Sequence, residues 1–178
     1  MVVTFLPLQA QALTYTFVNA AFSLTGGGSG TISGSFDYDG TAVTNFGSIE
    51  ISNWEFNGSL TPVLATYTGT TTAQGNLRFT GINGSANNSP SEFFQINNIL
   101  LSNTVETISL TSLNGGNDGE IGFCLNNGCP PTQYRIRTFA FTDGELTSVP
   151  LPLSPVALTP LALAMARIRK RYVTPGLR

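Results

Sequence analysis

The sequence predicts an all-β domain, an antiparallel β-sandwich or jelly roll of about eight strands, followed by a short apolar C-terminal helix. Three observations support this fold class: apolar and polar residues alternate in short runs, Asp-Gly and Asn-Gly pairs separate the runs, and no amphipathic helical pattern precedes residue 155. With 41% hydrophobic residues, the chain can bury a core. The predicted strands are 13–25, 30–39, 46–56, 76–82, 92–101, 105–113, 120–125 and 133–141.

The individual strands differ in how regularly they alternate. In 30–39 the apolar side chains share one face, formed by Ile32, Phe36 and Tyr38. In 13–25 the apolar positions change parity between Phe17 and Phe22, which predicts a β-bulge. A similar change occurs in 46–56, between Ile51 and Trp54. Turns are predicted at 39–40, 57–58, 83–84, 114–115, 117–119 and 143–144.

Charge is sparse and unevenly distributed. All ten acidic residues precede Leu146, whereas five of the eight basic residues lie in the last dozen positions. An acidic body repels phosphate groups, so nucleic-acid binding is not expected. The chain contains no histidine, which excludes Ser–His and Cys–His catalytic pairs and imidazole metal ligands.

The acidic residues do not form a recognisable catalytic pair, and the sequence therefore predicts a protein that is not an enzyme. Asp37 and Asp39 are two positions apart on the polar face of one strand, where solvated strand-end aspartates are the ordinary interpretation. Together with Asp118 and Glu120 they leave a structural Ca²⁺ open as an alternative, since carboxylates on turns suit a hard cation. No other cofactor is expected.

The N-terminal residues are typical of a signal peptide. Residues 1–12 are apolar and end in Ala10-Gln11-Ala12, with small residues at the −3 and −1 positions expected for signal peptidase. We therefore interpret residues 1–12 as the remnant of a signal peptide that is cleaved between Ala12 and Leu13. The alternative is an apolar first β-strand.

Two cysteines are consistent with export. Cys124 and Cys129 enclose four residues, and a disulfide between them would stabilise a small loop by about 2 kcal/mol. Such a bond requires an oxidising compartment. Two free thiols are the alternative.

The C-terminal residues combine an apolar segment with a basic cluster. Residues 146–166 carry no charge, and as one helix they would span about 30 Å, close to the thickness of a bilayer core. Four prolines interrupt this segment, so the predicted helix begins near Val156 or Pro160 and is short. A Pro-rich apolar tail is the alternative. The basic residues that follow are Arg167, Arg169, Lys170 and Arg171.

Three consecutive parts, Val149-Pro150-Leu151-Pro152, the apolar segment and the basic cluster, resemble the PEP-CTERM sorting signal of exported bacterial proteins. The resemblance is to the cyanobacterial variant, in which Pro-Leu-Pro replaces Pro-Glu-Pro. It implies that Val149, Pro150 and Pro152 form the motif recognised by an exosortase, a membrane-embedded cysteine protease. It also implies that Arg167, Arg169, Lys170 and Arg171 hold the C-terminus in the cytoplasm as a stop-transfer cluster.

The predicted organisation is a signal-peptide remnant (1–12), a β-sandwich domain (13–148), a PEP-CTERM-like sorting signal (149–172) and a tail (173–178). The expected function is that of an exported, non-enzymatic protein of the cell surface or extracellular matrix, anchored transiently in the membrane. Its expected partners are an exosortase-like protease, the membrane and exopolysaccharide.

A secreted carbohydrate-binding module is the alternative function. Exposed aromatic side chains can stack on sugars, and the candidates are Trp54, Tyr67 and Tyr134. The uncharged, β-prone run 66–72 also leaves edge-to-edge assembly open.

Overall fold

A computed structural model describes residues 12–53, 58–69, 73–81, 92–113, 117–124 and 134–152. In these ranges the chain forms β-strands and one short 3₁₀ helix, η2 (Leu110–Ser112). The strands are β1 Leu13–Leu24, β2 Ser29–Tyr38, β3 Val43–Thr44, β4 Glu50–Asn53, β5 Gly58–Leu60, β6 Leu64–Tyr67, β7 Gly75–Thr80, β8 Phe93–Ile99, β9 Thr107–Ser109, β10 Gly119–Cys124 and β11 Tyr134–Pro150.

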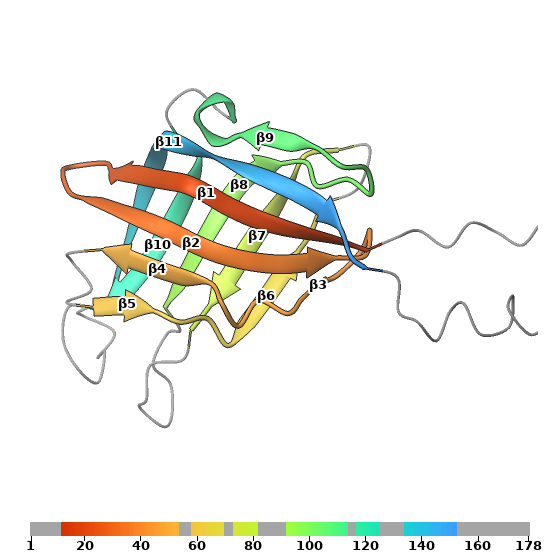
Figure 1. The fold of residues 1–178 in the computed structure, drawn as a ribbon. Helices are drawn as coiled ribbons and strands as arrows, with labels where there is room; N and C mark the ends of the chain where they lie inside the picture. The colour runs from red at the N-terminus through yellow and green to blue at the C-terminus, as the bar shows by residue number, and fades with distance from the viewer. Residues whose placement is uncertain are drawn as a thin grey trace, which may run out of the picture.

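The strands join into one antiparallel sheet that coils back on itself. Their order is β5-β4-β2-β1-β11-β10-β8-β7-β6, with β3 attached to β2 and β9 to β11. Figure 1 shows β1, β2, β4 and β5 in one layer, with β6, β7, β8 and β10 behind them. The 17-residue β11 belongs to both layers, because it pairs with β10 near its start and with β1 along most of its length. The predicted all-β antiparallel class is confirmed, and its two layers belong to one continuous, nearly closed sheet.

A β-bulge divides the central pair of strands, as the change of parity in 13–25 predicts. Val18 pairs with Glu145 and Ala21 with Asp143, so two residues of β1 face Gly144 alone. Gly144 has φ +112°, and a Cβ there would lie 2.4 Å from the Ala20 Cα. The position therefore requires glycine.

The interior between the layers is built largely from aromatic side chains. On one side of the bulge, Tyr15 stacks on Phe36 with ring centroids 5.5 Å apart. On the other side, Phe94 stacks on Phe139 at 4.5 Å. These rings are fully buried, as are the surrounding Phe22, Tyr38, Phe79 and Phe123.

Several predicted elements differ from the observed ones. The Asp143-Gly144 pair does not form a turn, and the prediction there is wrong because both residues lie inside β11 at the bulge. Of the predicted strand 46–56, the described residues contain only β4. The short strands β3, β5 and β6 have no counterpart among the predictions. Strand β11 also runs to Pro150, beyond the predicted domain boundary after residue 148.

The predicted C-terminal helix lies outside the described residues. Within the ranges that the structure describes, no helix has the length and hydrophobicity needed to cross a membrane.

Candidate functional site

The two predicted processing sites lie side by side at one end of the sheet. Leu13, the first residue after the predicted signal-peptidase site, pairs with Pro150, and Thr14 pairs with Val149. The Leu151 N–H donates a hydrogen bond of 3.1 Å to the Ala12 carbonyl. The start of β1 and the end of β11 therefore bring together residues almost 140 positions apart in the sequence. We call this end of the sheet, formed by residues 12–15, 36–39, 101–106 and 148–152, the terminal end.

Part of the predicted sorting signal is thus a strand of the folded body. Val149 and Pro150 are the last residues of β11, and Pro152 is exposed just beyond it. Val149 keeps 55% of its surface exposed and Val105 keeps 61%. Continuing the register of β9 and β11 by two residues places these two valines opposite each other, so apolar side chains cover this part of the outer surface.

Beneath this surface, a polar cluster holds the last residues of β11. The Ser148 N–H donates to the Glu106 carbonyl at 2.9 Å, and the Glu106 N–H donates to the Ser148 hydroxyl at 2.8 Å. The Glu106 carboxylate in turn accepts hydrogen bonds from the Tyr15 hydroxyl and from the Ser102 N–H and hydroxyl. The terminal cluster, Tyr15, Ser102, Glu106 and Ser148, therefore connects β1, β11 and the segment 101–106.

The tyrosine of this cluster remains a neutral donor at physiological pH. Burial raises the pKa of Tyr15 well above its usual value, and the hydrogen bond to Glu106 raises it further, because ionisation would place two negative charges together. The ring is fully buried against Phe36 and Tyr38. The terminal cluster can position strands, but its chemistry at neutral pH is that of hydrogen bonding.

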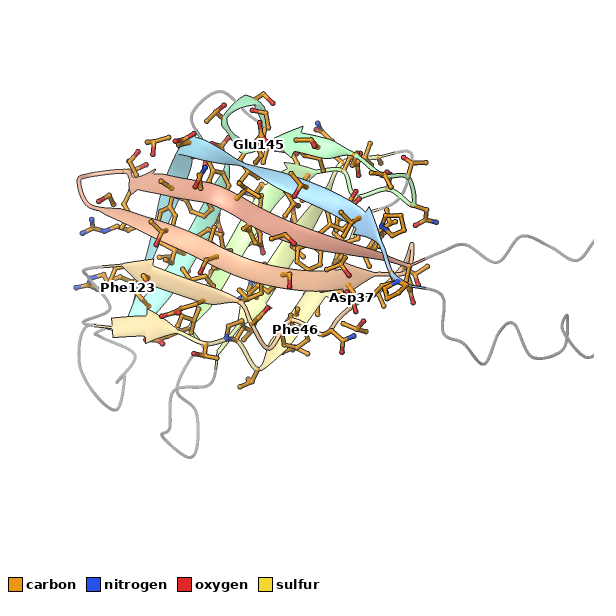
Figure 2. All side chains as sticks on the ribbon, viewed as in Figure 1. Asp37, Phe46, Phe123 and Glu145 are labelled. Atoms are coloured by element: carbon orange, nitrogen blue, oxygen red, sulfur yellow. The ribbon has the colours of Figure 1, made fainter. Side chains whose placement is uncertain are left out.

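A second acidic group lies on the outer face of the same end. Asp37 accepts hydrogen bonds of 2.6 Å from the Thr14 hydroxyl and from the Asn45 side-chain amide. Asp37 is only 8% exposed, so the interpretation of this residue as a solvated strand-end aspartate is wrong. The segment after β3 covers it, and Asn45 reaches the carboxylate from a left-handed backbone conformation with φ +52°. Figure 2 labels Asp37 at the end of the sheet where β11 finishes.

The other acidic residues considered as calcium ligands are separated from Asp37. Asp39 is exposed and accepts hydrogen bonds from the Thr41 N–H and hydroxyl and from the Ala42 N–H, which lowers its pKa. Asp118 immediately precedes β10 and Glu120 lies in it, and β10 pairs with the other half of β11. In the described part of the chain, no three acidic or cysteine side chains gather as a metal site would require.

Asp118 instead has a structural position that the sequence analysis missed. It is 2% exposed, and its carboxylate accepts a 2.7 Å hydrogen bond from the Phe141 N–H. Its own N–H donates to the Phe139 carbonyl at 2.8 Å. Asp118 therefore extends the β10–β11 pairing by one residue before the start of β10 and satisfies a backbone group beside the bulge.

Tyr67, one of the candidate sugar-binding aromatics, faces the interior. Its ring packs edge-on against Tyr38 at 5.3 Å, and its hydroxyl donates to the Ile99 carbonyl and accepts from the Leu101 N–H, both at 3.2 Å. Tyr67 is therefore partly buried against the core, with its hydroxyl engaged by backbone groups. Trp54 and the side chain of Tyr134 lie outside the described structure.

The remaining predicted site residues lie wholly or partly outside the described residues. Cys124 ends β10, but its side chain and the whole of Cys129 are outside the described residues, so the disulfide stays a prediction. The same holds for the second half of the run 66–72, of which β6 contributes Thr66 and Tyr67. Also outside are Ala10, Arg167, Arg169, Lys170 and Arg171.

The terminal cluster could not be found from sequence spacing. Its residues come from four segments that are distant in the chain, and each taken alone is an ordinary strand or turn residue. The only local signal was the alternation of 13–25, which places Tyr15 on the inner face. Comparisons of the chain with family models, curated proteins and solved structures give no match.

Proposed function

We propose that this chain is an exported, non-enzymatic protein of the cell surface or extracellular matrix, delivered by its C-terminal sorting signal. The observation that carries the proposal is the position of Val149-Pro150-Leu151-Pro152 at the end of the last strand, followed by an apolar segment and a basic cluster. In this position the motif directly joins a folded body to the segment that would be held in the membrane.

The geometry of the terminal end supports such a route. Ala12 and Pro152 are neighbours across the Ala12–Leu151 hydrogen bond, so the predicted N-terminal and C-terminal processing sites face the same side of the body. A protein anchored through both segments during export would keep its sheet on one side of the membrane. Cleavage at both sites would then release the body without removing a central strand.

The charge distribution supports the same orientation. The body is acidic, whereas Arg167, Arg169, Lys170 and Arg171 follow the apolar segment directly. A charge at the bilayer centre costs about 2.5–3.5 kcal/mol on insertion scales, so four adjacent cations resist translocation. The proposed partners are accordingly an exosortase-like protease, the membrane during sorting, and exopolysaccharide at the final location.

Two sets of variants in the full chain test the proposal in an exporting cell. Replacing the four basic residues by Gln should abolish membrane retention of the precursor, with Arg135→Gln, an exposed arginine of β11, as the matched control. Replacing Pro150 and Pro152 by Ala should leave insertion intact and raise the ratio of precursor to mature form, with Pro175→Ala as the control. Fractionation and intact mass measure both effects. The proposal fails if deletion of 149–178 leaves the location and mass of the mature body unchanged.

A further inference from the structure

Polar side chains form a continuous row across the outer face of the layer that contains β6, β7, β8 and β10 (Figure 1). Each member is paired with the next across the strands, and directly paired residues of an antiparallel sheet share a face. At one end of the row, the Thr25 and Thr138 hydroxyls share a hydrogen bond of 2.7 Å. All members are exposed or half-buried, whereas apolar residues beside them along the strands are buried in the core. We call the following six residues the transverse row: Thr66, Arg78, Gln95, Glu120, Thr138 and Thr25.

The centre of the transverse row is oriented by contacts among side chains of the same outer face. The Arg78 guanidinium lies over the Phe93 ring, 3.7 Å from its centroid, and donates a hydrogen bond of 3.5 Å to the Gln95 Oε1. The Gln95 Nε2 in turn donates to the Asn97 Oδ1 at 2.8 Å. Phe93 is only 3% exposed, yet it lies outside the main hydrophobic cluster of the described residues, and it supports the guanidinium from below. The planar groups of Arg78 and Gln95 are therefore held in place without a ligand.

The chemistry of the transverse row is complementary to the hydroxyl groups of a sugar. The guanidinium of Arg78 only donates hydrogen bonds, the carboxylate of Glu120 only accepts them, and the amide of Gln95 between them does both. Sugar hydroxyls also donate and accept. Arg78 and Glu120 contribute one charge of each sign, so the row is neutral as a whole within an acidic body. Because the body repels anions, this chemistry favours an uncharged glycan over an acidic one.

The spacing of the transverse row matches an extended polysaccharide. Neighbouring strands lie about 4.8 Å apart, which is close to the length that one hexose unit adds to an extended β-linked chain. Five such spacings separate Thr66 from Thr25, so the row is about 24 Å long and corresponds to about five hexose units.

An apolar row runs beside the transverse row, two residues away along each strand. Leu64 and Ile136 form its ends and are 53% and 57% exposed, and Phe93 lies between them. The C–H groups of a sugar ring can pack against such side chains while its hydroxyls bind polar groups.

We propose that the transverse row binds an uncharged, β-linked polysaccharide that crosses the strands, with about one hexose unit for each strand. This inference deepens the proposed function and rests on it for exopolysaccharide as the natural partner. None of the six residues belongs to the segments that the proposed processing would remove, so the row is retained in the mature body.

Titration of the purified full chain with cello-oligosaccharides, from cellobiose to cellohexaose, tests the inference. The affinity should increase with each added unit up to about five units and change little beyond that length. In NMR spectra, cellohexaose should shift the amide signals of Gln95, Glu120 and Thr138 and leave that of Thr31, on the outer face of β2, unchanged. The proposal is overturned if cellohexaose does not bind at millimolar concentration, if cellobiose binds equally well, or if hexagalacturonate, an acidic oligosaccharide, binds more tightly.

Two substitutions test the named side chains. Gln95→Ala and Glu120→Gln should each weaken cellohexaose binding about five- to tenfold, because each removes hydrogen bonds to the sugar. Glu145→Gln, an exposed glutamate in the other half of β11, is the matched control and should bind normally. Urea denaturation checks that the variants fold, and the amide shifts of the unchanged protein locate the site without any substitution. Normal binding by both Gln95→Ala and Glu120→Gln would contradict the assignment of the row.

A failure of the proposed function gives a different result. If deletion of 149–178 leaves the location of the body unchanged, the sorting route is wrong, but the titration of the purified chain is unaffected. If the oligosaccharides do not bind while the deletion abolishes sorting, the proposed route stands and the inference about the transverse row is wrong.

Discussion

The β1–β11 pair is stabilised in different ways on the two sides of its bulge. In the half toward the β1–β2 turn, Phe22, Phe94 and Phe139 pack together with ring centroids 4.5 to 5.2 Å apart. In the half toward the chain ends, the interior aromatic rings are joined by the hydrogen-bonded terminal cluster. Figure 2 places Asp37 at this terminal end and Phe123 at the opposite end.

This comparison distinguishes the interactions that supply most of the stability from those that determine which segments lie together. Burial of apolar surface is the dominant favourable contribution to folding and is non-directional. Hydrogen bonds to the partly buried Glu106 carboxylate contribute less, yet they require defined partners, and therefore fix which residues of β1, β11 and 101–106 lie together. The half that holds the predicted processing sites thus combines aromatic packing with a carboxylate-centred hydrogen-bond network that joins three segments.

The largest expected effect is in the aromatic half. Phe139→Ala removes a fully buried ring that contacts Phe22, Phe94 and Phe141, and should lower the free energy of unfolding by about 3–5 kcal/mol. Val105→Ala at the exposed terminal surface is the control and should change it by less than about 0.5 kcal/mol. Urea denaturation measures both. Similar losses for the two variants would show that the aromatic interior is not the main source of stability.

The second-largest loss of stability is expected at the β-bulge that divides the two halves of the β1–β11 pair. Gly144→Ala places a Cβ 2.4 Å from the Ala20 Cα, on a backbone with φ +112°. It should lower the free energy of unfolding by about 2–3 kcal/mol. Gly47→Ala is the matched control, because a Cβ there meets no atom within 4 Å. The thermal midpoints of the two variants compare them directly. If Gly144→Ala were as stable as Gly47→Ala, the bulge geometry described for β11 would be wrong.

The terminal cluster should be sensitive to loss of one hydroxyl. Tyr15→Phe removes the hydroxyl that is hydrogen-bonded to Glu106 and to the Ser102 backbone. It should lower the free energy of unfolding by about 1–3 kcal/mol. Tyr38→Phe is the matched control, since the Tyr38 hydroxyl is buried with no hydrogen-bond partner among the described residues. Tyr38→Phe should therefore leave the free energy of unfolding nearly unchanged or raise it. A larger loss for Tyr38→Phe than for Tyr15→Phe would contradict the assignment of the cluster.

The same tyrosine should also make stability depend on alkaline pH. Because the pKa of Tyr15 is raised by burial and by Glu106, the unfolded chain releases the proton more readily than the folded one. The contribution of neutral Tyr15 to the free energy of unfolding is therefore complete below about pH 10, the pKa of tyrosine in an unfolded chain. It is lost as the pH rises from there toward the pKa of the folded state. Denaturation series at increasing pH should show a shallower decline for Tyr15→Phe than for the unchanged protein. Identical slopes would rule out a contribution from Tyr15.

The smallest effect is expected on the outer face of the terminal end. Asp37→Asn replaces a carboxylate that accepts two hydrogen bonds by an amide that has one acceptor oxygen and one donor nitrogen. The substitution should lower the free energy of unfolding by about 1 kcal/mol. The exposed Glu145→Gln in the same sheet is the control. Urea denaturation would detect the difference, and equal stability of the two variants would indicate that the Asp37 contacts are not energetically important.

The sequence was sufficient for features that depend on neighbouring residues. The alternation in 30–39 predicted β2, and the change of parity in 13–25 predicted the bulge, because burial forces the side chains of a strand to alternate. The prediction of a turn at Asp143-Gly144 was wrong because the same residue pair suits a bulge, and the choice is made by the partner strand. Asp37 was misassigned for a similar reason: Asn45, which helps to bury it, reaches it from a segment after β3 that local patterns did not identify.

The central claim is that the predicted sorting motif begins inside the folded sheet. Residue-resolved amide hydrogen exchange of the full chain tests it at Ser148 and Leu151, whose N–H groups bond to Glu106 and Ala12. Both amides should exchange at least about tenfold more slowly than in an unstructured peptide of the same sequence, with Ser148 the slower of the two. Exchange of Ser148 at the rate of the peptide would contradict the claim, since the body would then end before the motif.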